Sequence, residues 1–108
     1  MLTLRFVETP IFTREVRRLL PDEAYRELQW ALVFRPTQGV VIRGSGGLRK
    51  LRWGAAGRGK RGGIRLIYYW NAAEEAFYML YVYAKGVRDD LTPVQLKLLR
   101  QAVREEFR

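Results

Sequence analysis

The sequence predicts an α+β domain with the element order β-α-α-β-β-β-α, and three observations lead to that prediction. The chain has 108 residues and 48% hydrophobic content, which suits one folded domain over residues 1–108. Apolar residues recur at helical spacing in the first third and near the C-terminus. Between these regions lie short runs that alternate with period two or are rich in β-branched and aromatic residues, as in strands.

The N-terminal third is expected to be a strand followed by two helices. Residues 2–7 alternate between apolar and other side chains, which predicts a first strand. Thr9 can cap a helix that holds Pro10 in its first turn, and apolar residues follow at helical spacing. Pro21 ends that helix and can open a second one over 21–34, where two early acids suit the helix dipole. We expect a helical hairpin.

The middle of the chain predicts a connection, a strand and a loop. Residues 35–47 hold one proline and four glycines, which favour a connection over a continuing helix. Alternation returns over 48–53, with Leu48, Lys50 and Arg52 on one face. Residues 54–63 are rich in glycine and basic, so we expect a mobile loop.

The last part of the chain predicts a β-hairpin and a helix. The runs 64–70 and 77–83 are β-branched and aromatic and flank a polar turn. With the preceding strand they make an antiparallel meander. Thr92 and Pro93 form a cap and first-turn pair, after which apolar residues recur at helical spacing to the C-terminus.

The net charge of +9 is concentrated in one segment. Residues 28–73 contain no acid, and the rest of the chain has equal numbers of basic and acidic residues. The basic residues of the segment are Arg35, Arg43, Arg49, Lys50, Arg52, Arg58, Lys60, Arg61 and Arg65. Such a distribution favours a polyanion-binding surface over a solvated face that happens to lack acids. A membrane-surface helix is disfavoured, because the segment lacks an apolar stripe.

Histidine and cysteine are both absent, which narrows the possible chemistry. Thiolate nucleophiles, disulfides and Cys-based zinc sites are excluded, and acid-base catalysis would have to use Lys, Tyr, Asp or Glu. We expect no cofactor and no metal. No run resembles a signal peptide, and the longest uncharged apolar run, 76–84, is far shorter than the roughly 20 residues of a membrane helix. A soluble, cytoplasmic protein is expected.

Four stretches resemble a known family. The runs GSGGLRKLRW, GRGKRGG, IRLIYYW and YVYAKGVRDDLTPVQ are similar to the signature stretches of HigB-type members of the RelE toxin superfamily, and they occur in that family's order. The resemblance implies a compact RelE-like α+β fold whose antiparallel sheet has its helices packed on one side. It also implies an endoribonuclease that cleaves mRNA in the ribosomal A site without a metal. The expected partners are the ribosome with its mRNA and a cognate antitoxin carrying a helix-turn-helix DNA-binding domain.

The resemblance also assigns candidate residues. The resemblance implies that the family's catalytic basic strand corresponds to Lys50 and Arg52, and that its arginine in the following strand corresponds to Arg65. The family's tyrosine and lysine at the end of the last strand correspond to Tyr83 and Lys85. The basic residue found just after the last strand in RelE has no clear match here. Gly86 follows Lys85, so it stays open whether Lys85 takes that role. The expected contacts to RNA or the ribosome are Arg49, Arg58, Lys60 and Arg61.

These residue types suit RNA cleavage by 2′-OH attack. An arginine donates two hydrogen bonds to phosphate oxygens and stays charged, so Arg65 is the first candidate to stabilise the transition state. A lysine transfers protons only when its pKa falls; neighbouring positive charges lower it and bound phosphates raise it. Lys50 is the candidate base. Tyr83 or Tyr69 could stack on a base, whereas other strand tyrosines more often belong to the core.

Two structural alternatives stay open at this point. Lys50 and Arg52 could simply protect an edge strand from aggregation. The chain could also be a non-catalytic basic RNA- or DNA-binding module, or a toxin homologue that has lost its activity. An NTPase is disfavoured, because the lysine of the glycine-rich loop is followed by Arg61 rather than by Ser or Thr.

Overall fold

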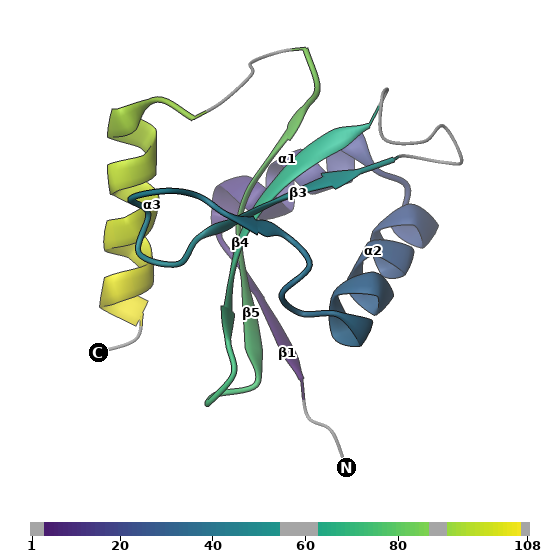
Figure 1. Ribbon diagram of the computed structural model, residues 1–108. Coiled ribbons are helices and arrows are strands. Elements are labelled where there is room, and N and C mark those ends of the chain that lie inside the picture. The colour runs from purple at the N-terminus through teal and green to yellow at the C-terminus, as the bar shows by residue number, and fades with distance from the viewer. Residues whose placement is uncertain (1–3, 55–62, 87–90, 107–108) are drawn as a thin grey trace.

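A five-stranded mixed sheet forms the centre of the protein. The computed structural model describes residues 4–54, 63–86 and 91–106, and Figure 1 shows its elements. The strand order is β1-β5-β4-β3-β2. The elements are β1 (Arg5–Glu8), α1 (Pro10–Leu19), α2 (Asp22–Phe34), β2 (Val40–Val41), β3 (Arg49–Trp53), β4 (Ile64–Asn71), β5 (Ala76–Ala84) and α3 (Pro93–Glu106). The predicted α+β class and the β3-β4-β5 meander are confirmed.

The expected helix starts form as the sequence suggests. The Thr9 hydroxyl accepts a hydrogen bond from the Phe12 N–H at 3.1 Å and donates one to the Leu80 carbonyl at 2.9 Å, so it caps α1 and ties it to β5. Thr92 and Gln95 form a reciprocal capping box at the start of α3, with bonds of 3.1 and 2.9 Å. Local capping therefore fixes where these helices begin.

The helices cover both faces of the sheet, so the expectation that they pack on one side is wrong. Helices α1 and α2 enclose one core cluster with residues such as Leu66 and Phe77. Helix α3 packs Leu96 and Leu99 against the other face, over Ile67, Tyr78 and their neighbours, and stands apart from α1 and α2 in Figure 1. The physical reason is that β4 and β5 carry apolar side chains on both faces, and both faces must be buried.

The first strand runs parallel to its neighbour, which corrects the expectation of a purely antiparallel sheet. Strand β1 pairs with β5 from Arg5 opposite Ala76 to Glu8 opposite Met79. The chain then passes through the α1–α2 hairpin to the far edge of the sheet, where β2 lies. Because alternation fixes which face a side chain occupies and not the direction of pairing, the sequence could not supply this detail.

The connection 35–47 contains a short strand that the sequence did not reveal. Strand β2 pairs Val40 and Val41 with β3, and both valines are exposed. A tight loop over 42–48 follows, in which the buried Ser45 hydroxyl donates to the Ile42 carbonyl at 2.5 Å and accepts from the Leu48 N–H at 3.0 Å. The loop thus has a defined shape.

In the described part of the chain, every helix is too short or too polar to span a bilayer.

Candidate active site

The side chains of β3 and β4 alternate between the two faces, as predicted for residues 48–53. Leu51 belongs to the core under α1 and α2, so Lys50 and Arg52 point to the face that α3 covers, called here the α3 face. On β4, Leu66 points to the α1–α2 core, and Arg65 therefore also points to the α3 face. The register brings these predicted residues together.

Arg52 and Arg65 lie directly opposite each other. They are paired positions of the antiparallel strands β3 and β4, and Arg65 is in turn opposite Tyr83 on β5. Such partners have Cβ atoms about 4.5–5.5 Å apart, and two like charges in this arrangement repel. Within the described ranges neither arginine forms an ion pair with a carboxylate. We call Arg52 and Arg65 the arginine pair.

A bulge in β5 brings Tyr83 to this row. The β4–β5 register shifts between Ile67 and Tyr68, where Leu80 is the additional residue in β5. Tyr83 is only 4% exposed, and its ring lies 5.7 Å from that of Tyr81 between centroids. A base cannot stack on a buried ring, so in this conformation Tyr83 packs beside Arg65 rather than presenting an aromatic platform.

Lys50 lines a groove beside the arginine pair. The groove has a volume of about 370 Å³ and lies between strand β2, the loop that follows it, and α3. Lys50 is opposite Ile67, two residues along β3 from Arg52 and on the same face, and it is half-buried. The groove is lined by Val40, Val41, Ile42, Arg43, Lys50, Ile67, Leu91 and Leu96. It could hold a nucleotide next to the positive charges.

Lys85 is exposed just beyond the end of β5. Its backbone N–H donates to the Gly63 carbonyl at 3.1 Å, which ties it to the start of β4, two residues before Arg65. The structure therefore places Lys85 at the same end of the meander as the arginine pair.

Arg49 points to the opposite face from the other candidates. Its guanidinium donates to the carbonyls of Thr37 at 3.1 Å and Gly39 at 2.7 Å, so it braces the connection that leads to β2. Burial raises the pKa of the neighbouring Tyr68, an effect that the Gly39 N–H and the Arg49 charge oppose. The other expected RNA contacts, Arg58, Lys60 and Arg61, lie outside the described residues.

Basic side chains of α3 were missed by the sequence argument. Lys97, Arg100 and Arg104 line a pocket of about 340 Å³ together with Gly44 and Gln101. Their spacing of three and four residues places them on one helix face, which was the available signal. The net charge along the sequence does not reveal this basic face, because outside residues 28–73 acidic residues balance the basic ones.

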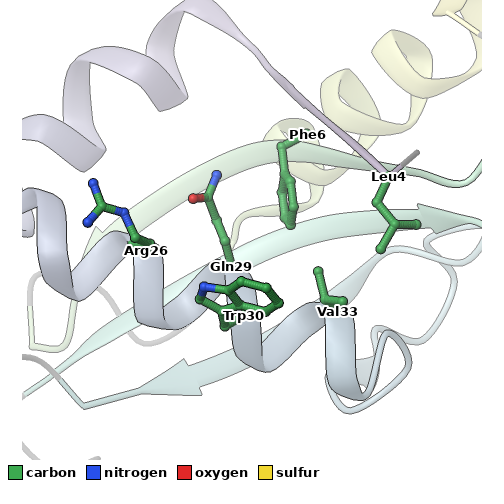
Figure 2. Close-up of a pocket in the computed structure, with 6 residues that line it drawn as sticks. All are labelled: Leu4, Phe6, Arg26, Gln29, Trp30 and Val33. Carbon is green, nitrogen blue, oxygen red and sulfur yellow. The ribbon is translucent and has the colours of Figure 1, made fainter. Parts of the chain in front are cut away.

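A second, apolar groove lies on the far side of the sheet. Figure 2 shows Leu4, just before β1, and Phe6 of β1 facing Trp30 and Val33 of α2. Among the described residues that line this groove, Arg26 is the charged one, and a single cation provides no second group for proton transfer or phosphate binding. The α3 face is therefore the better candidate active site.

The α3 face offers what phosphodiester chemistry requires. The arginine pair can donate to the non-bridging oxygens of one phosphate, where negative charge develops during cleavage. Lys50 lies on the same face of β3 as Arg52, and Lys85 follows β5 at the same end of the meander, which makes both lysines candidates for proton transfer.

A comparison with family models identifies the chain. The model described as the RelE toxin of the RelE / RelB toxin-antitoxin system matches residues 7–107. The chain belongs to the RelE toxin family. As a RelE-family protein it is the toxin of a toxin-antitoxin pair, which implies an antitoxin partner, and toxins of this family are generally endoribonucleases. The match extends from β1 to the C-terminal helix, so it covers every element that builds the α3 face.

Proposed function

We propose that this RelE-family toxin is a ribosome-dependent endoribonuclease that cleaves mRNA in the A site by metal-independent attack of a 2′-OH. The observation that carries the proposal is the arginine pair. Two arginines opposite each other, without a carboxylate partner in the described ranges, cost stability unless an anion binds between them. A phosphate of the bound RNA is the natural anion for two planar guanidinium groups.

Each candidate residue has a role in the proposed reaction. The 2′-oxygen attacks phosphorus, the P–O5′ bond breaks, and the products carry a 2′,3′-cyclic phosphate and a 5′-OH. Arg65 and Arg52 stabilise the charge on the phosphorane-like transition state. Lys50 and Lys85 supply the base that takes the 2′-OH proton and the acid that protonates the leaving oxygen. Tyr83 holds Arg65 in position from the neighbouring strand.

The partner and the location complete the proposal. The toxin acts in the cytoplasm, where the ribosome is its platform and basic residues such as Arg58, Lys60 and Arg61 contact ribosomal RNA. An antitoxin with a helix-turn-helix DNA-binding domain silences it by covering or distorting the α3 face.

Cleavage of mRNA on purified, programmed ribosomes tests this function. We expect Arg65→Ala to lower the single-turnover rate about 10²–10³-fold, the effect of losing one transition-state donor. Arg65→Lys should recover only part of the rate, because an ammonium cannot donate in the bidentate geometry. Arg17→Ala, at the end of α1 on the other side of the sheet, is the control and should cleave normally.

The substrate provides an independent test of the mechanism. An mRNA with a 2′-deoxy nucleotide at the cleaved position should bind and remain intact, because the attacking group is absent. The same mRNA without ribosomes should also remain intact. If Arg65→Ala cleaved as fast as the unchanged toxin, the site assignment would be wrong. If the unchanged toxin cleaved nothing on ribosomes, the non-catalytic binding module or the inactive homologue would be the correct description.

A further inference from the structure

Helix α3 and the 42–48 loop form a basic pocket outside the proposed catalytic residues. Lys97, Arg100 and Arg104 project from one face of α3 toward Gly44, and the pocket they line has a volume of about 340 Å³. Figure 1 shows the loop between β2 and β3 reaching α3. The charged residues among its described lining are Lys97, Arg100 and Arg104, all of them basic.

Arg100 is held against the loop without a partner for one of its donors. A Cβ atom added at Gly46 would lie 3.4 Å from Arg100 Nε, so the guanidinium packs within van der Waals reach of the loop. Gly46 also has a φ of +72°, which favours glycine. Arg100 Nε is buried and has no hydrogen-bond partner in the described part of the chain. A buried donor of this kind is costly unless a ligand accepts from it.

The other cations of the pocket also lack an ion-pair partner in the part of the chain that the structure describes. None of Lys97, Arg100 and Arg104 forms a salt bridge with a described carboxylate. Lys97 and Arg104 are exposed and can reach a ligand from both sides of Arg100. Three cations around one donor-rich pocket are suited to an oxyanion with several acceptor oxygens.

The pocket continues the groove of the proposed active site. Leu96 lines both the Lys50 groove and the α3 pocket, and consecutive residues Arg43 and Gly44 line one each. A chain of phosphates that passes the arginine pair and Lys50 would therefore meet the α3 pocket next. The loop that separates the two is braced by the Ser45 hydrogen bonds, so the relative positions are defined.

We propose that Lys97, Arg100 and Arg104 bind an RNA backbone phosphate that flanks the cleaved one. The inference rests on the proposed function, because it takes the RNA of that reaction as ligand. The phosphate belongs to the mRNA strand or to the ribosomal RNA around it, and the chemistry of recognition is the same. These three residues position RNA and take no part in bond breaking.

The test compares two charge-matched double variants in binding assays that need no catalysis. Lys97→Gln/Arg104→Gln removes two exposed cations from the pocket, and Arg17→Gln/Arg26→Gln removes two exposed cations from α1 and α2. The first probe is a fluorescent 2′-O-methyl RNA oligonucleotide, which lacks the attacking hydroxyl. The second probe is the vacant ribosome. Affinity is measured for both between 50 and 200 mM KCl.

The expected result is a smaller salt dependence for the pocket variant alone. Each single-strand phosphate that the protein neutralises contributes about 0.7 to the slope of log affinity against log salt, so losing this one phosphate lowers the slope by about 0.7. A smaller slope with the oligonucleotide assigns the phosphate to mRNA. A smaller slope with vacant ribosomes, but not with the oligonucleotide, assigns it to ribosomal RNA. If neither probe responds, or both double variants respond equally, the proposal is overturned.

Cleavage measurements separate this inference from the proposed function. If Arg65→Ala abolishes cleavage while the pocket variant binds both probes like the control, the function stands and the pocket assignment fails. If the unchanged toxin cuts no mRNA but the slope difference persists, the phosphate site stands and the catalytic proposal fails. Arg100→Gln provides a third variant, and its urea midpoint shows whether any effect comes from lost packing against Gly46.

Discussion

Removing the hydroxyl of Tyr68 should destabilise the protein strongly, although the aromatic ring stays in place. Tyr68 is fully buried, and its hydroxyl donates to the Pro36 carbonyl at 2.7 Å and accepts from the Gly39 N–H at 3.0 Å. One oxygen therefore satisfies two backbone groups of the connection between α2 and β2. Tyr68→Phe leaves both groups without this partner and creates no cavity beyond one oxygen atom.

The magnitude follows from the burial of the two groups. The Gly39 N–H is buried and loses its acceptor, which costs about 1–3 kcal/mol, whereas the partly buried Pro36 carbonyl loses a bond worth about 1 kcal/mol and can turn to water. We expect a total loss of about 2–4 kcal/mol. With an unfolding entropy of about 2.1 cal/mol/K per residue, the melting temperature of a domain of this size falls by about 9–18 °C.

Equilibrium unfolding in urea, followed by tryptophan fluorescence, measures this loss. The midpoint should fall while the slope with denaturant stays constant, because the surface exposed on unfolding does not change. Tyr81→Phe is the matched control, since Tyr81 lies on the α3 face and is only half-buried. A loss below about 0.5 kcal/mol for Tyr68→Phe, or an equal loss for both variants, would refute the reasoning.

Three further predictions concern the elements that hold the site. Thr9→Ala removes the α1 cap and should cost about 1–2 kcal/mol of unfolding free energy, measured in urea; an unchanged midpoint would contradict the capping role. Gly63→Ala would make its Cβ atom clash with the Trp53 carbonyl oxygen, so the start of β4 must move. We expect a lower melting temperature and slower mRNA cleavage. Unchanged values of both quantities would contradict this prediction. Burial and the Glu8 carboxylate raise the pKa of Tyr25 above the unfolded value near 10. As the pH rises, the Tyr25 hydroxyl therefore loses its proton in the unfolded state before it does so in the folded state. Unfolding free energy should therefore decline above about pH 10, and Tyr25→Phe should flatten the decline in urea titrations at pH 8 to 11.

Much of the fold was predictable because local signals are strong here. The Thr9 and Thr92 caps, Pro21 between the first two helices and the alternation over 48–53 predicted element boundaries that the structure confirms to within a few residues. The short β2 strand was missed, since two exposed valines in a glycine-containing connection carry no period that a sequence can show.

The candidate site was only partly predictable. Alternation placed Lys50 and Arg52 on one face, but the register that sets Arg65 opposite Arg52 exists only when β3 and β4 pair. The β5 bulge at Leu80, which determines the face on which Tyr83 lies, also has no signature in the sequence. The basic face of α3 was missed because charge was counted along the chain rather than over the surface.

The sequence by itself determined the types of the elements other than β2, the absence of histidine and cysteine chemistry, and the acid-free basic segment over residues 28–73. These are properties of composition and local periodicity, which need no knowledge of distant contacts. Only the tertiary structure decided that β1 runs parallel to β5, that α3 covers the second apolar face, and that Arg49 braces a loop on the opposite side from the arginine pair. Strand pairing and helix packing bring together residues far apart in the chain, and burial of apolar surface selects their arrangement.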